Sequence, residues 1–136
     1  MSVEKPYHNK EQYTELSLDI LSIKSDYNLP IVLIGDFNGR TGVLNDVMLM
    51  ETNDNIDIGN YDHPDILKTF NSLNIPVQRT NIDRKTNNNG YQLIEMCKLT
   101  EICIINGRFG ADKNVGKTTY NSVSTIDCNV FSKFIC

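Results

Sequence analysis

The hydrophobic residues near the start of the chain follow a helical period. Between Lys10 and about Lys24, apolar positions recur every three or four residues, which is the spacing of an amphipathic helix. The stripe consists of Tyr13, Leu16, Ile20 and Leu21, widened by Leu18 and Ile23. The pattern predicts a surface helix that begins near Asn9.

Short apolar runs further along the chain predict strands. The run from Ile31 to Ile34 is uninterrupted and follows a cluster of turn residues, a pattern typical of a strand that is buried on both faces. A second run extends from Ile102 to Asn106. Two more strands are expected at 118–120 and 126–131.

The segments between these runs complete an α/β pattern. The Asn-rich stretch 87–90 precedes apolar residues at helical spacing, which predicts a second helix of about ten residues with an Asn at or near its N-cap. Residues 44–86 are mostly polar, and we expect loops with short irregular elements there. Glycines between 107 and 116 indicate turns. The whole chain, 1–136, is expected to form a single domain.

Composition narrows the possible partners. The 136 residues include 17 acidic and 13 basic ones, giving a formal net charge of −4. A broad nucleic-acid-binding surface neutralises phosphates with Lys and Arg, so any nucleic-acid contact should be focused at one site. No run of about 18 apolar residues and no signal peptide are present, which predicts an intracellular protein with no membrane partner.

Three further patterns are interpreted as structural. The four cysteines show no paired spacing, and we expect reduced, mostly buried thiols. Residues 110–118 look like a phosphate-binding loop, but Ala111 stands where the motif requires glycine. Residues 53–62 look like a calcium loop, but Ile56 and Ile58 fall at ligand positions. Neither segment is therefore expected to bind its ligand.

The most informative segment is IVLIGDFNGRTG, residues 31–42. Asp36 and Asn38 follow the apolar run two residues apart, so both should face a common point while Phe37 points into the core. Gly35 lets the backbone bend without a Cβ. A carboxylate and a carboxamide suit a hard metal ion or an attacking water. The alternative interpretation is an ordinary turn in which Asp and Asn form local hydrogen bonds.

GDFN after an apolar strand resembles the magnesium-dependent endonuclease/exonuclease/phosphatase superfamily, which includes abasic-site endonucleases and the endonuclease domains of LINE-type retrotransposons. Two further blocks are similar to retroelement-associated members, in the same order. They are NGYQLIEMCKLTEICIINGRFG at 89–110 and STIDCNVFS at 124–132. The resemblance covers nearly the whole chain, from about Tyr7 to Phe131.

The resemblance implies site residues and a cofactor. Asp36 would activate the attacking water and Asn38 would contact the scissile phosphate, and both could hold Mg²⁺ (or Mn²⁺). Asp127 would orient a catalytic histidine. Thr119 would correspond to a residue that contacts a phosphate. Arg40 could pair with a flanking phosphate, and the alternative for Arg40 is a solvated arginine in a turn. The implied substrate is DNA, hydrolysed at its phosphodiester bonds.

The fold implied by the resemblance is a two-sheet α/β sandwich of the DNase-I-like type, of which this chain would be the C-terminal half, incomplete at both ends. The family's magnesium-binding Glu and its closing Ser-Asp-His have no counterpart here. Glu4, Glu11 and Glu15 are expected on the surface, and neither His8 nor His63 stands in a comparable context. The expected partners are the remainder of the domain or a reverse transcriptase in a parent polypeptide.

Loss of several charge-stabilising groups predicts that the isolated chain is inactive, since one such group contributes about 3 kcal/mol. The competing functions are a catalytically dead remnant or binding scaffold, and a phosphatase of the same superfamily that acts on lipid or inositol phosphates. A half-sandwich should also expose strand edges and apolar surface, which predicts poor solubility. Activity on DNA would imply a nuclear location, although no basic localisation run is present.

Overall fold

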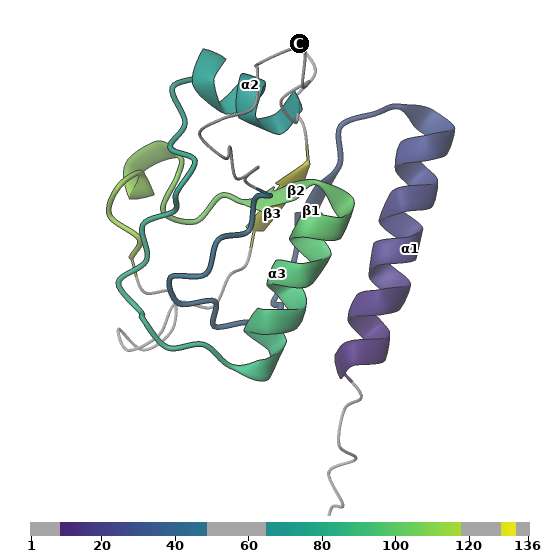
Figure 1. Cartoon of the computed structure of the whole chain (residues 1–136), viewed down its shortest axis with the longest axis horizontal. Coiled ribbons are helices and arrows are strands. Elements are labelled where there is room, and N and C mark those ends of the chain that lie inside the picture. Colours follow the sequence, from purple (N-terminus) through teal and green to yellow (C-terminus); the bar gives the residue numbers. More distant parts are fainter. Residues whose placement is uncertain (1–8, 49–64, 118–128, 133–136) are drawn as a thin grey trace, which may run out of the picture.

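The computed structural model describes residues 9–48, 65–117 and 129–132. Its elements are α1 (Asn9–Tyr27), β1 (Val32–Ile34), α2 (Asp65–Ser72), α3 (Asn88–Thr100), β2 (Ile102–Ile104), the short 3-10 helix η1 (Gly110–Asp112) and β3 (Asn129–Ser132). Figure 1 shows α1 and α3 side by side, both running in the same direction, with the strands beside α3. The mixed α/β class expected from the sequence is confirmed.

Helix α1 confirms the first predicted helix, including its start at Asn9. Ile20 is buried, and Tyr13 and Leu16 are partly buried against the main hydrophobic core. Leu18 and Ile23, expected to widen the apolar stripe, are 62% and 43% exposed. The helix therefore packs through a narrow stripe and leaves the flanking apolar side chains in solvent.

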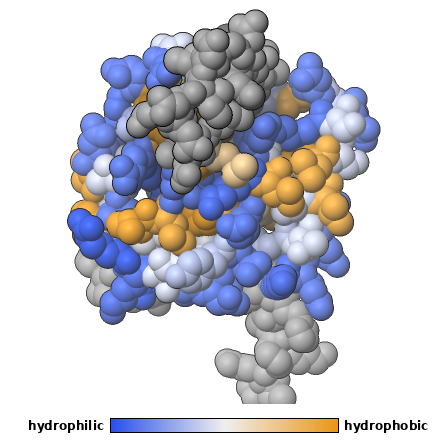
Figure 2. Space-filling model, viewed as in Figure 1, coloured by the Kyte–Doolittle hydropathy of each residue, from blue (hydrophilic) through white to orange (hydrophobic). Residues whose placement is uncertain are grey.

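Strand β1 corrects one expectation. The run at 31–34 was expected to be buried on both faces, but Val32 is 46% exposed and Ile34 is 81% exposed, whereas Ile31 and Leu33 pack against the core. Alternate residues of a strand point to opposite faces, and the described elements cover only one of them. Hydrophobic surface also gathers in patches on the face of the molecule seen in Figure 2.

The strand β3 joins the other two. It pairs antiparallel with β1, with Val32 opposite Phe131, and antiparallel with β2, with Ile102 opposite Ser132. The resulting strand order is β1-β3-β2, so β1 and β2 run in the same direction on either side of β3. The strand expected at 126–131 is found in part as β3, and the one expected at 118–120 lies outside the described residues.

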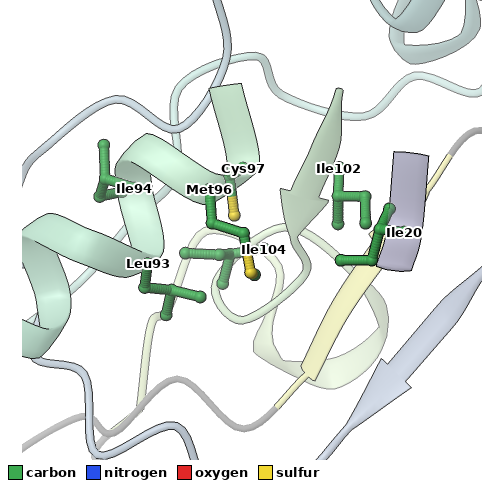
Figure 3. Close-up of a cluster of buried hydrophobic side chains, with 7 residues drawn as sticks. All are labelled: Ile20, Leu93, Ile94, Met96, Cys97, Ile102 and Ile104. Atoms are coloured by element: carbon green, nitrogen blue, oxygen red, sulfur yellow. The ribbon is translucent and has the colours of Figure 1, made fainter. Parts of the chain in front are cut away.

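The main core forms where α3 packs against β2 and α1. Figure 3 shows the buried side chains of this cluster, which come from the three elements. They are Ile20, Leu93, Ile94, Met96, Cys97, Ile102 and Ile104. This result confirms the second predicted helix, although α3 is longer than expected, at 13 residues, and it confirms the strand expected at 102–106 in part, because β2 ends at Ile104.

A second cluster lies around α2 and corrects the expectation of irregular loops across 44–86. Ile66 and Phe70 of α2 are buried with Val47 and Cys103, and Leu67, Ile75 and Val77 pack against them. The apolar residues of α2 do follow a helical spacing, but the segment has only eight residues within an Asp- and Asn-rich stretch. Such a short helix depends on tertiary packing rather than on its own propensity.

Candidate functional site

The GDFN turn follows β1 directly and places Asp36 and Asn38 in solvent. The Asn38 backbone N–H donates to Asp36 Oδ1 at 2.9 Å, and Asn38 has a positive φ of 50°. Asn tolerates this left-handed conformation better than most residues. The local turn hydrogen bond offered as the alternative interpretation is thus present. It occupies one oxygen position of the Asp36 carboxylate without burying the group.

Both side chains contribute to one surface hollow of about 180 Å³. Its lining is completed by the first two turns of α1, the first turn of α3 and the residue between Asp36 and Asn38, namely Gln12, Tyr13, Leu16, Asn89 and Phe37. Phe37 packs partly buried against the core, as expected, and its carbonyl accepts a 2.6 Å hydrogen bond from the Tyr13 hydroxyl. Asp36 and Asn38 are therefore brought together, and their catalytic role stays a prediction.

The GDFN turn is also attached to the amino end of α3. Asn87 is the N-cap of α3, and its Oδ1 accepts hydrogen bonds from the Gly90 N–H at 2.7 Å and from the Arg40 N–H at 2.9 Å. Its Nδ2 donates to the Asn38 carbonyl at 2.9 Å. The sequence predicted an Asn at or near the N-cap of this helix, but not which Asn it is, nor the contacts of Asn87 with Asn38 and Arg40.

Arg40 forms an ion pair rather than projecting freely into solvent. Its Nε and Nη2 donate to the two oxygens of Asp83 at 2.8 and 2.9 Å, and the Asp83 side chain is only 4% exposed. These hydrogen bonds raise the pKa of Arg40 above its ordinary value. The contact of Arg40 with a flanking phosphate stays a prediction, and a guanidinium engaged in this way has fewer donors left for it.

Arg108, from the Asn-Gly-Arg block, is buried. Its guanidinium donates to both oxygens of Asp46, at 2.6 and 2.7 Å, and to the carbonyls of Pro76, Val77 and Ile104. The Phe70 ring centroid lies 5.1 Å from its central carbon. Arg108 therefore joins the core clusters, and this part of the block is structural.

The remaining site predictions divide by position. Asp127, Thr119, Glu4, His8 and His63 lie outside the described residues. Glu11 and Glu15 are exposed on α1, as expected. Within the described ranges, no group of three or more His, Cys, Asp or Glu side chains is arranged to hold a metal ion. Asp36 and Asn38 offer oxygen donors that suit Mg²⁺, which often takes only one or two protein carboxylates and keeps several waters.

The described cysteines confirm the expectation of buried thiols in part. Cys97 and Cys103 are both buried and neither forms a disulfide, whereas Cys128 and Cys136 lie outside the described residues. Burial raises the pKa of the Cys103 thiol to about 12, with a smaller opposing effect from Arg108. A thiol this reluctant to ionise is a poor nucleophile and a poor metal ligand at neutral pH.

Comparison with protein-family models, with curated proteins and with solved structures finds no match for this chain. Among the helices in the described part of the chain, none combines the length and apolar character needed to cross a bilayer.

Proposed function

We propose that this chain carries part of a magnesium-dependent phosphodiesterase domain that hydrolyses DNA phosphodiester bonds, of the retroelement-associated endonuclease type that the GDFN, Asn-Gly-Arg and S-x-I-D blocks resemble. The observation that carries the proposal is the shared hollow: Asp36 and Asn38 line it together at the end of a strand, beside the amide side chains of Gln12 and Asn89. Exposed oxygen and amide groups are what a phosphodiester and its cation require.

In this proposal each residue has a distinct task. The Asp36 carboxylate orients the attacking water and supplies an oxygen to the cation, while the Asn38 carboxamide donates a hydrogen bond to a phosphate oxygen. A bound Mg²⁺ (or Mn²⁺) would supply positive charge for the developing negative charge on the phosphate. Thr119 and Arg40 are proposed to contact flanking phosphates.

The pairing of β3 supports a role for Asp127 in the same site. Asp127 lies outside the described residues, but it precedes Asn129 by two positions, and Asn129 pairs with Ile34 at the end of β1. The described part of β3 therefore begins opposite the end of β1, next to which Asp36 lies, and this pairing supports the proposal that Asp127 acts at the same site.

We propose further that cleavage requires groups beyond this chain. Asp36 is the one carboxylate among the described residues that line the hollow. A sandwich in which a second sheet covers the exposed face of β1, carried by the remainder of the domain or by a reverse-transcriptase polyprotein, would supply a further metal ligand and histidine. The DNA substrate would place such a protein in the nucleus.

A plasmid-nicking assay in the presence and absence of Mg²⁺ tests the proposal. The chain is assayed alone and joined to segments that bear a buried Glu upstream and Ser-Asp-His downstream. We expect no nicking by the chain alone and nicking by the joined protein, abolished by Asp36→Ala and by Asp127→Ala. Asp19→Ala, an exposed α1 residue outside the hollow, is the matched control. Nicking by the joined protein that survives Asp36→Ala would overturn the proposal.

The second candidate is a catalytically inactive remnant or binding scaffold. The observation in its favour is that Arg40 is engaged in an ion pair with Asp83, and that no Lys or Arg is among the described residues that line the hollow. DNA binding without nicking by the joined protein would support it. Release of phosphate from inositol phosphates in a parallel assay, with no nicking, would instead support the superfamily's phosphatase branch.

A further inference from the structure

We infer that Asn87 is a positioning residue, which fixes the Asp36–Asn38 turn on the amino end of α3 and so holds the two side chains over their hollow. The role of this turn in binding a cation rests on the proposed function. The attachment of the turn to α3 by Asn87 does not, and it can be tested separately. Asn87 does not line the hollow and is not expected to touch substrate.

Asn87 contacts both ends of the Asn38–Arg40 segment. Its side chain donates to the Asn38 carbonyl and accepts from the Arg40 N–H, both at 2.9 Å, and its backbone N–H donates to the Arg40 carbonyl at 3.0 Å. The same Oδ1 accepts from the Gly90 N–H within α3. One carboxamide thus ties Asn38 and Arg40, the two ends of this three-residue segment, to the first turn of a helix.

Close packing reinforces these hydrogen bonds. A Cβ built on Gly90 would lie 1.9 Å from the Arg40 carbonyl oxygen, which means that the backbones of α3 and the turn are in direct contact. The next turns of α3 carry Leu93 and Ile94, which are buried in the main core. The turn therefore takes its position from a helix that the core holds in place, although Asp36 and Asn38 are themselves exposed.

The hollow depends on the same connection. Asn89 lines the hollow from α3, two residues after Asn87, while Asp36 and Asn38 line it from the turn. Asn38 adopts a left-handed conformation with φ 50°, and its N–H donates to Asp36 Oδ1. A change that releases the Asn38 carbonyl should loosen this hydrogen bond, although Asn87 does not take part in it.

Hydrogen exchange of single amides tests the inference on the full chain. Serine is a good N-cap and can keep the bond to Gly90, but it is too short to reach the turn as well, so Asn87→Ser separates the two roles. We expect the amide of Asn38 to exchange about tenfold faster in this variant, while the α3 amides from Leu93 onward keep their protection. Asn88→Ser, at the exposed neighbouring position, is the matched control and should leave the Asn38 amide unchanged. Unchanged exchange at Asn38 in Asn87→Ser would overturn the inference.

Binding of Mn²⁺ connects the inference to function. In spectra of the ¹⁵N-labelled chain, Mn²⁺ should broaden the amides of 36–38, and Asn87→Ser should raise the Mn²⁺ concentration needed by several-fold, with Asn88→Ser like the unaltered chain. If the unaltered chain shows no broadening there, the proposed cation site fails and the exchange result still decides the role of Asn87. If both variants bind Mn²⁺ equally well, Asn87 does not position the site.

Discussion

Arg108 and Asp46 form a buried ion pair in which the guanidinium nitrogens and carboxylate oxygens match two by two, at 2.6 and 2.7 Å. Their side chains are 1% and 0% exposed. Asp46 also accepts a hydrogen bond from the Ile104 backbone N–H at 2.7 Å, so this buried N–H of β2 has a partner. The pair thereby connects the segment that contains Asp46 to β2, whose residues Ile102 and Ile104 belong to the main core.

Removing one partner of this pair should be strongly destabilising. We expect Asp46→Ala to lower the free energy of unfolding by about 3–5 kcal/mol, because it leaves a buried guanidinium without its counter-charge. Urea unfolding measures the effect, with Asp19→Ala on the exposed face of α1 as the control, expected within about 0.5 kcal/mol of the unaltered chain. The double variant Asp46→Ala with Arg108→Met should lose less than the sum of the single losses. A loss below about 1 kcal/mol in Asp46→Ala would contradict the buried pair.

The ion pairs also show where sequence reasoning reached its limit. Periodicity and capping signals predicted α1, α3 with its Asn cap, and β2, because these elements depend on local spacing. Arg40 and Asp83 are 43 residues apart, and Asp46 and Arg108 are 62 apart, so no local pattern joins them. The exposure of Ile34 was missed for a related reason. An apolar run reveals a strand, but not how many of its faces have a partner.

Gly90 should tolerate no side chain, although it lies in a helix. Replacing a helical glycine with alanine usually stabilises by about 0.5–1 kcal/mol, but here the new Cβ would meet the Arg40 carbonyl oxygen at 1.9 Å. We therefore expect Gly90→Ala to lower the free energy of unfolding by about 2 kcal/mol or more. Gly35→Ala is the control, since a Cβ there meets nothing within 4 Å. Equal stability of the two variants in urea would show that α3 and the turn are not in contact.

Cys103 should make the chain less stable in alkali. Its pKa is raised from about 9 to about 12 in the folded chain, so the unfolded chain loses this proton first as the pH rises. The contribution of this thiol to the free energy of unfolding is fully present below pH 9 and is lost between pH 9 and 12, with a loss of roughly 1 kcal/mol at pH 10. Urea unfolding from pH 8 to 10 measures the slope, and Cys103→Ala should have a shallower slope than the unaltered chain. Parallel slopes would contradict the assigned cause.

Arg40 should contribute more to the free energy of unfolding than the exposed Arg84 does. Arg40→Gln removes a positive charge and two hydrogen bonds from Asp83, whose side chain is only 4% exposed. We expect a clearly lower midpoint of urea unfolding, whereas Arg84→Gln, at an exposed position, should leave the midpoint unchanged. If the two variants unfold alike but Arg40→Gln alone weakens DNA binding by the joined protein, the phosphate-contact role is supported instead.

The exposed face of β1 should limit solubility. Ile34 is 81% exposed and Val32 is 46% exposed on a three-residue strand, and the chain just before the strand also exposes Tyr27 and Leu29, at 65% and 62%. Ile34→Thr keeps a β-branched residue suited to a strand while removing apolar surface, so it should change the free energy of unfolding by less than about 0.5 kcal/mol. We expect it to reduce the aggregated fraction in gel filtration and light scattering. The opposite result, an unaltered chain that is already monomeric and melts cooperatively at high concentration, would show that this face needs no cover and would remove the physical argument for a missing second sheet.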